Sequence, residues 1–315
     1  MSASSSSFSR RSFVGLAASV SALAGLGLAG CSNSSAPASS DNGDDSSAAL
    51  SGTIVCSGAT SFQPLVESAA NNFMDANGDV NITVTGGGSG QGLSDIKDGK
   101  AQIGRSDVFA ETKLEAADVE KLQDNQVAIV GMGPIVNSNV SVDDLTTEQL
   151  KGIFTGEITN WSEVGGDDAT IQVINRKAGS GTRATFEDAV LAGAKVPDSF
   201  KPVAEEDSSG TVVEKVSQTE NSISYLAFSY FDDTKFKALS VDGVAPTTEN
   251  VESGDFKIWS YEHMYTAKDA DDVTKAFIEY MLSDEVQGSL VEEEGFIPLT
   301  DMKVKKDADG TISAK

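Results

Sequence analysis

Hydrogen-bond donors are concentrated in residues 175–183, which read Asn-Arg-Lys-Ala-Gly-Ser-Gly-Thr-Arg. The stretch follows a short apolar run and precedes a helical pattern. A strand, a Gly/Ser turn and a helix place unpaired backbone N–H groups and the positive end of a helix dipole around one small volume. Arg176, Ser180 and Thr182 add side-chain donors there. The pattern predicts a receptor for a small tetrahedral oxyanion, although a strand-to-helix turn with an ordinary Ser/Thr cap has the same appearance.

Two further turns repeat this theme. Gly58-Ala59-Thr60-Ser61 lies between an expected strand and an expected helix, and Gly88-Ser89-Gly90 does the same for the next pair. Ligands of open α/β sheets bind outside the carboxyl ends of the strands, where such turns gather. One hydroxyl turn is weak evidence because Ser and Thr are ordinary N-caps. Several in one chain favour a site where donors from two lobes surround one oxyanion.

Asp107 is the residue that could discriminate between oxyanions. A carboxylate repels an anion, but it accepts a hydrogen bond from an anion that carries a proton. Phosphate keeps at least one proton near neutral pH and sulfate keeps none, so an ionised Asp107 would favour hydrogen phosphate. Two opposed acceptors cost roughly 1–3 kcal/mol, and more when charged. Arg176 would pair with Asp107 or with the ligand through its guanidinium fork. The alternative is that Asp107 is a surface or helix-capping acid.

The first thirty residues carry an export pattern. Ser9-Arg10-Arg11-Ser12-Phe13-Val14 resembles a twin-arginine signal, and the apolar stretch after it is too short to span a bilayer comfortably. It ends in Leu28-Ala29-Gly30-Cys31, which is similar to a bacterial lipobox in which Cys31 is lipidated. A chance cysteine after an ordinary signal is the alternative. Residues 31–50 are rich in Ser, Ala, Asp and Asn, and we expect a disordered tether.

The formal net charge of −25 excludes several classes of partner. Loss of residues 1–30, which carry two arginines and no acid, would bring it to −27. Such a balance argues against nucleic acid and anionic membrane surfaces, and an anion site would have to work through local donors. Cys56 would have no disulfide partner if Cys31 carries lipid, and the single His263 does not support a zinc site or a histidine-based triad. We therefore expect no metal and no cofactor.

Strand-like and helix-like patterns alternate along the chain, which is typical of α/β layers around a largely parallel sheet. We expect strands at 53–57, 80–85, 103–104, 127–136 and 171–174, and helices at 63–75, 93–98, 111–121 and 184–191.

The body after the tether, about 260 residues, is long enough for two lobes with separate cores. The apolar run at 127–136 and the segment at 256–266 are interpreted as two crossings between the lobes. Lobe I would comprise residues 51–133 and 262–305, and lobe II would comprise residues 134–261. Residues 306–315 would form a charged tail that frays.

Several motifs stand in the order seen in the phosphate-binding subunits of bacterial phosphate ABC transporters, the PstS-type periplasmic binding proteins. The likeness covers nearly all of residues 52–300. Thr155–Trp161 and Ile223–Leu226 also look like signatures of that family. The motifs that carry the resemblance are Gly58-Ala59-Thr60, Gly88-Ser89-Gly90, Ile103-Gly104-Arg105-Ser106-Asp107 and Arg176-x-x-Gly179-Ser180-Gly181-Thr182.

The resemblance implies a type II periplasmic binding protein fold, with two α/β lobes joined by two crossover segments and the ligand in the cleft between them. It also implies a membrane permease and cytosolic ATPase subunits as partners. Ser61 and Gly181 would act mainly through their backbone N–H groups. The residues that fall on ligand-contacting positions are Thr60, Ser61, Ser89, Asp107, Arg176, Ser180, Gly181 and Thr182.

Two positions depart from the family pattern. Ser61 stands where many relatives carry Phe, and Arg105 is bulkier than the small residue often found before Ser-Asp. These departures affect the expected affinity rather than the expected class of ligand. Arg183 could supply a further charge behind the contacting residues.

The leading hypothesis is a lipid-anchored extracytoplasmic receptor, monomeric when free, that closes two lobes around one phosphate ion and delivers it to an ABC importer. Receptors for sulfate, molybdate or arsenate, and a surface sensor or adhesin with the same fold, remain open. An enzyme acting on phosphate esters is a further alternative, since a donor-rich pocket can stabilise a phosphoryl transition state. The sequence shows no recognisable nucleophile–base pair and no carboxylate cluster for two metal ions, which such an enzyme would need. We therefore expect no catalysis.

Overall fold

The computed structural model describes residues 50–315. The export pattern at 1–30, the lipidation site Cys31 and the tether up to residue 49 lie outside the described residues. Among residues 50–315, no helix combines the length and the apolar character needed to cross a membrane.

One nine-stranded sheet is the frame of the described residues. Its strands are β1 (Ser51–Gly58), β2 (Asp79–Thr85), β3 (Ile103–Ser106), β4 (Leu122–Asn137), β6 (Gln172–Arg176), β7 (Ala204–Glu206), β8 (Ser222–Ala227), β9 (Phe236–Ala238) and β11 (Trp259–Ala267). Their order in the sheet is β2-β1-β3-β11-β4-β8-β6-β7, and β9 pairs with β4 in addition. Two small two-stranded sheets are formed by β5 (Asp144–Leu145) with β10 (Ser240–Val241), and by β12 (Val304–Lys306) with β13 (Ile312–Ala314).

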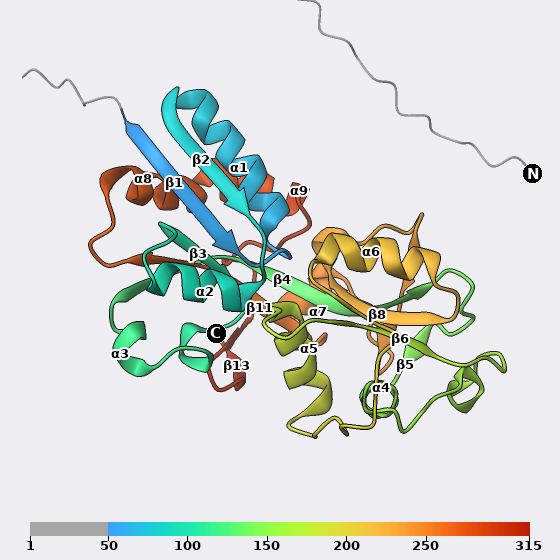
Figure 1. The fold of residues 1–315 in the computed structure, drawn as a ribbon. Coiled ribbons are helices and arrows are strands. Elements are labelled where there is room, and N and C mark those ends of the chain that lie inside the picture. The colour runs from blue at the N-terminus through green and yellow to red at the C-terminus, as the bar shows by residue number, and fades with distance from the viewer. Residues whose placement is uncertain (1–49) are drawn as a thin grey trace, which may run out of the picture. The chain divides into compact units, whose positions relative to one another are not determined.

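Helices cover the sheet. They are α1 (Gln63–Ala76), α2 (Ser89–Lys97), α3 (Ala116–Val119), α4 (Thr147–Thr155), α5 (Gly181–Leu191), α6 (Ser209–Gln218), α7 (Thr248–Glu252), α8 (Asp272–Met281) and α9 (Val291–Glu293). Figure 1 shows α6 on one side of the β8–β6 part of the sheet, with α4 and α5 on the other. The side chains of Leu65, Val66, Ala69, Ala70 and Phe73 form one buried stripe on α1, as their helical spacing predicts.

The sheet is mixed, which corrects the expectation of a largely parallel one. β1 is parallel to β2 and β3, and β6 is parallel to β7 and β8. β11 is antiparallel to β3 and β4, and β4 is antiparallel to β8 and β9. Each antiparallel pair of this sheet includes β4 or β11, the two long strands. The chain runs across the sheet along β4 and returns along β11, so these two strands point in opposite directions.

β4 connects two parts of the sheet, one formed by β2, β1, β3 and β11 and the other by β8, β6 and β7 (Figure 1). It pairs with β11 up to Gly131 and with β8 from Met132 onward. Its residues 127–137 are all buried. A strand covered on both faces needs apolar residues without alternation, which explains the continuous apolar run in the sequence. The lobe boundaries expected at 133/134 and 261/262 stay a prediction.

The C-terminal residues form a docked hairpin, which corrects the expectation that this charged tail frays. β12 and β13 pair in antiparallel register. The Lys306 ammonium lies over the Trp259 ring, 4.5 Å from its centroid, a cation–π arrangement. The Lys303 N–H donates to the Glu252 carbonyl at 2.9 Å. These contacts tie the tail to β11 and to α7.

Candidate anion-binding site

Four helices begin close together, each after a strand. α1, α2, α5 and α6 follow β1, β2, β6 and β7, respectively. Hydrogen bonds join the turns before them: the Gly90 N–H donates to the Gly179 carbonyl at 3.0 Å, and the Ser209 N–H donates to the Thr60 hydroxyl at 3.2 Å. A helix N-terminus carries partial positive charge and unpaired N–H groups, so these turns favour an anion where they meet.

Asp107 lies where three of these turns meet, and only 2% of it is exposed. Its Oδ1 accepts a hydrogen bond from the Ser61 hydroxyl at 2.6 Å, and its Oδ2 accepts one from the Thr182 hydroxyl at 3.0 Å. Its backbone N–H donates to the Ser89 hydroxyl oxygen at 2.9 Å. One carboxylate is thus held by the turns before α1, α2 and α5.

The Arg176 guanidinium forms the other part of the cluster and is 1% exposed. Its Nη2 donates to the Thr60 hydroxyl at 3.2 Å and to the Asp207 carbonyl at 3.1 Å. Its Nη1 donates to the Ser209 hydroxyl at 3.3 Å. Burial lowers the pKa of Arg176 below its ordinary value, yet a guanidinium remains charged in proteins. The sequence left Arg176 to pair either with Asp107 or with the ligand. Within the described residues its guanidinium makes no hydrogen bond to the Asp107 carboxylate.

The structure brings together all eight residues that the sequence assigns to the site. Ser180 caps α5, with its hydroxyl oxygen accepting from the Arg183 N–H at 3.2 Å. Arg183 lies behind the cluster and donates to the Arg176 carbonyl at 2.7 Å. Contact with a ligand stays a prediction for each of the eight, which are all buried: Thr60, Ser61, Ser89, Asp107, Arg176, Ser180, Gly181 and Thr182.

Two glycines allow the turns to approach one another this closely. A Cβ atom on Gly181 would lie 2.1 Å from the Ser89 hydroxyl oxygen and 2.8 Å from Cβ of Asp107. A Cβ atom on Gly92 would lie 2.5 Å from the Arg105 carbonyl oxygen. Real Cβ contacts are almost never shorter than 3.0 Å, so a side chain at either position would push the turns apart.

Arg105 lies beneath the cluster with none of its surface exposed. Its Nη1 donates to the Ala59 carbonyl at 2.9 Å, and its Nη2 donates to the Thr85 carbonyl. The guanidinium therefore ties the turn before α1 to the end of β2. Burial lowers the pKa of Arg105, but it remains a cation at neutral pH. It adds a second buried positive charge near Asp107.

Sequence reasoning did not assign four buried or half-buried residues of this region to the site: Arg105, Ser209, Tyr230 and Glu262. Ser209 had a readable signal, because it begins a Ser-Gly-Thr turn like that of 180–182. The Tyr230 hydroxyl donates to the Thr60 carbonyl at 2.8 Å, a contact between distant segments that no local pattern indicates. Glu262 belongs to β11 and reaches the cluster through the pairing of β11 with β3, whereas Arg105 belongs to β3 and reaches it through the pairing of β3 with β1.

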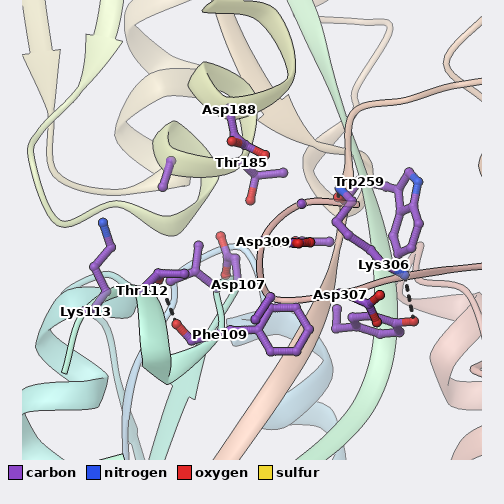
Figure 2. A pocket seen from close by; sticks show the side chains of 16 residues that line it. Asp107, Phe109, Thr112, Lys113, Thr185, Asp188, Trp259, Lys306, Asp307 and Asp309 are labelled. Carbon is purple, nitrogen blue, oxygen red and sulfur yellow. Dashed lines mark hydrogen bonds between the residues drawn. The ribbon is translucent and has the colours of Figure 1, made fainter. Parts of the chain in front are cut away.

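A cavity of about 200 Å³ adjoins Asp107. Figure 2 shows Asp188 of α5 and Asp309 of the tail among its walls, together with the Phe109 and Trp259 rings. Asp107 is its only lining residue among the eight assigned to the site. Lysines also line this space, but its several carboxylates make it a poor receptor for an anion. We therefore assign the anion site to the buried turns.

The donor set suits binding of an oxyanion. In residues 50–315, no group of three or more His, Cys, Asp and Glu side chains is arranged to hold a metal ion. The His263 imidazole pairs with Asp124 at 2.9 Å through Nδ1. Cys56 is buried, and desolvation raises the pKa of its thiol to about 12. Neither side chain has the geometry of an activated nucleophile–base pair with a hydroxyl of the cluster.

Comparisons with known proteins agree with this chemistry. A family model described as a PBP superfamily domain matches residues 43–285. Phosphate-binding protein PstS of Bacillus subtilis (strain 168) is 48% identical over 263 residues, which cover 84% of this chain and 86% of that protein. Phosphate-binding protein PstS of Borreliella burgdorferi is 30% identical over 256 residues, covering 76% and 88%.

Solved structures extend the comparison to the fold. A Clostridium perfringens protein, solved with bound phosphate and described as a phosphate ABC transporter substrate-binding protein, has a TM-score of 0.71 and 33% identity. The match covers 79% of this chain and all of that one. An ABC-type phosphate transport receptor from Vibrio cholerae has a TM-score of 0.63 and 28% identity, covering 78% and 99%.

Proposed function

Because this chain belongs to the PBP superfamily and, within it, to the family of phosphate-binding protein PstS, we propose that it captures inorganic phosphate and delivers it to an ABC importer. The observation that carries the proposal is the cluster of Asp107 and Arg176 among four helix N-termini. Two buried guanidinium groups and the helix termini supply positive potential, and the carboxylate supplies one acceptor. This combination fits an oxyanion that still carries a proton.

The eight residues assigned to the site would divide the work. The hydroxyls of Thr60, Ser89 and Ser180 and the Arg176 guanidinium would donate to phosphate oxygens, together with backbone N–H groups at Ser61, Gly181 and Thr182. Asp107 would accept the hydrogen of the ligand. The Ser61 and Thr182 hydroxyls already donate to Asp107, so we assign these two side chains a second role, which is to orient that carboxylate.

Capture and release would require the two parts of the sheet to move relative to one another. The site residues are buried, and hydrogen bonds such as Gly90 N–H to Gly179 join turns from different parts of the sheet. β4 and β11 are the long strands along which the chain passes between those parts. A hinge there would open the site, and phosphate would favour the closed state through the contacts that it makes only in that state.

Calorimetric titration of the protein with inorganic phosphate tests this proposal, after dialysis has removed phosphate that co-purifies. We expect saturable binding of one ion per chain. Titrations with sulfate and molybdate separate the phosphate receptor from receptors for other tetrahedral oxyanions. Absence of any phosphate heat at concentrations that saturate a control phosphate-binding protein would refute the proposal.

We propose that the protein acts at the outer face of the cell membrane as a lipoprotein anchored through Cys31. The export pattern and the lipobox-like Leu28-Ala29-Gly30-Cys31 support this. Its partners would be the permease and ATPase subunits of the importer, to which it would deliver the ion as a monomer. Mass spectrometry of the mature N-terminus tests the anchor: a diacylated Cys31 is expected, and a mature chain that begins elsewhere would contradict it.

We propose binding without turnover. The support is the donor set of the cluster, in which the hydroxyls bond to Asp107, Arg176 or backbone groups rather than to a histidine base. Incubation with a chromogenic phosphate ester provides the test. No release of chromophore above the uncatalysed rate is expected, whereas release that is lost in a Ser180→Ala variant would favour an enzyme.

A further inference from the structure

Glu262 is a buried carboxyl group beside Asp107 that the proposed function does not use. β11 runs antiparallel to β3 with His263 opposite Ser106. The next residue in each direction is Glu262 on β11 and Asp107 after β3, so the register brings these two side chains to the same place. A bulge lies between Glu262 and His263, and bulges of this kind redirect a side chain.

The surroundings of Glu262 disfavour a second negative charge. None of its surface is exposed, and within the described residues neither of its carboxyl oxygens has a hydrogen-bond partner. The charged groups that face it are Asp107 and Arg105, and Ser61 is a neutral polar neighbour. The Arg105 guanidinium donates to two backbone carbonyls, and within the described residues it makes no hydrogen bond to Glu262.

These conditions raise the pKa of Glu262 well above its usual range. Burial is the main cause, followed by the negative charge of the neighbouring Asp107 carboxylate. Arg105 and Ser61 act in the opposite direction. Two carboxyl groups that share one buried place cannot both ionise easily, and the protonated one becomes a hydrogen-bond donor.

Building on the phosphate-binding function proposed above, we infer that Glu262 is a positioning residue that keeps its proton and donates a hydrogen bond to the Asp107 carboxylate. A carboxylate offers about four acceptor positions. The hydroxyls of Ser61 and Thr182 occupy two, and Glu262 occupies a third. One position remains for the hydrogen of the ligand. Glu262 thereby fixes the direction in which Asp107 accepts.

The charges of the buried groups agree with this assignment. Arg105, Arg176, Asp107 and a hydrogen phosphate dianion together leave one net negative charge. An ionised Glu262 would add another, in a place without solvent to screen it. Ionisation of Glu262 should therefore oppose phosphate binding.

Two variants of similar size separate a proton donor from a packing role. Glu262→Gln keeps a neutral donor in place, whereas Glu262→Met keeps the volume and removes the donor. We expect Glu262→Met to bind phosphate about tenfold or more weakly, because a hydrogen bond to a charged group contributes at least the 1.4 kcal/mol that corresponds to tenfold in Kd. Glu262→Gln should recover most of that loss. Equal losses in the two variants, or no loss in Glu262→Met, would overturn the inference.

An infrared difference spectrum between the wild type and Glu262→Gln, recorded without ligand at neutral pH, detects the proton directly. We expect the carbonyl band of a protonated carboxylic acid in the wild type only, and its absence would overturn the inference even if Glu262→Met did not fold. A pH series adds a second test. The titration of phosphate is common to both proteins, so a ratio of wild-type to Glu262→Gln Kd that stays constant from mildly acidic to neutral pH supports the inference. A ratio that rises over that range would show that Glu262 loses its proton there, and would contradict it. A wild type that binds no phosphate but shows the band would instead refute the proposed function alone.

Discussion

Gly181 is the position at which a single added methyl group should damage the site without disturbing the helix that carries it. Gly181 is the first residue of α5, where alanine is a better helix former than glycine. The added Cβ would lie 2.1 Å from the Ser89 hydroxyl oxygen and 2.8 Å from Cβ of Asp107. The Ser89 hydroxyl could rotate, but it would then lose its hydrogen bond from the Asp107 N–H. The Asp107 Cβ can move only with its backbone.

The size of the effect follows from the distances. An ordinary contact of 3.4 Å requires the Ser89 oxygen to move away by about 1.3 Å, and a misplacement of about 1 Å can cost a positioned group on the order of 10²-fold. We therefore expect Gly181→Ala to weaken phosphate binding by about 100-fold, or about 2.7 kcal/mol. The free energy of unfolding should change much less, because the turn opens without exposing the core.

Calorimetric titration with phosphate measures the loss, and a thermal melt followed by circular dichroism shows whether the fold is kept. Gly210→Ala is the matched control, because Gly210 also lies in the first turn of a helix and its added Cβ would come no closer than 4.0 Å to the Ser208 hydroxyl oxygen. The control should bind as the wild type does. A folded Gly181→Ala variant with wild-type affinity would refute the view that ligand-binding groups meet at this turn.

Two further predictions concern buried cations. Arg105→Leu should lower the free energy of unfolding by at least about 2 kcal/mol, because two carbonyls lose their donor at roughly 1–3 kcal/mol each; a denaturant midpoint equal to that of the wild type would contradict this. Burial lowers the pKa of Lys306 from 10.5 in the unfolded chain to about 8 in the folded one. The free energy of unfolding therefore carries the whole cost of burying the charged ammonium below pH 8, and none of it above pH 10.5, where the group is neutral in both states. Stability relative to Lys306→Met should therefore rise between these pH values by up to about 3 kcal/mol, and by less where solvent screens the half-buried ammonium. Denaturant unfolding of both proteins from pH 7 to 10.5 measures the difference, and parallel profiles would show that the docked hairpin does not hold the ammonium out of water.

The α/β fold of the periplasmic binding proteins is confirmed, and the strands and helices that position the site lie close to their predicted places. α2 and α5 begin at Ser89 and Gly181, a few residues earlier than their apolar patterns indicate. The reason is that the Gly-Ser and Gly-Thr turns themselves form the first helical turn. Their donors, which local sequence could reveal, therefore point along the helix axis toward the site.

The parts of the site that escaped prediction depend on contacts between distant segments. Glu262 reaches Asp107 only through the register of β11 on β3 and the bulge beside it, and strand register across 155 positions has no local signature. Arg105 looked like a bulky departure from a family pattern, and its partners, the Ala59 and Thr85 carbonyls, become visible only in three dimensions. The tail looked unstructured because its charges suggest solvent, whereas Lys306 packs against Trp259.

The central claim is that Asp107 accepts a hydrogen from the bound ion, and calorimetric titration with phosphate and with sulfate tests it most directly. In the wild type we expect phosphate to bind about 10- to 100-fold more tightly than sulfate, since two opposed acceptors cost roughly 1–3 kcal/mol or more. In Asp107→Asn, which can donate through its amide, this preference should largely disappear. Equal affinities of the wild type for the two ions, or an unchanged preference in Asp107→Asn, would contradict the account.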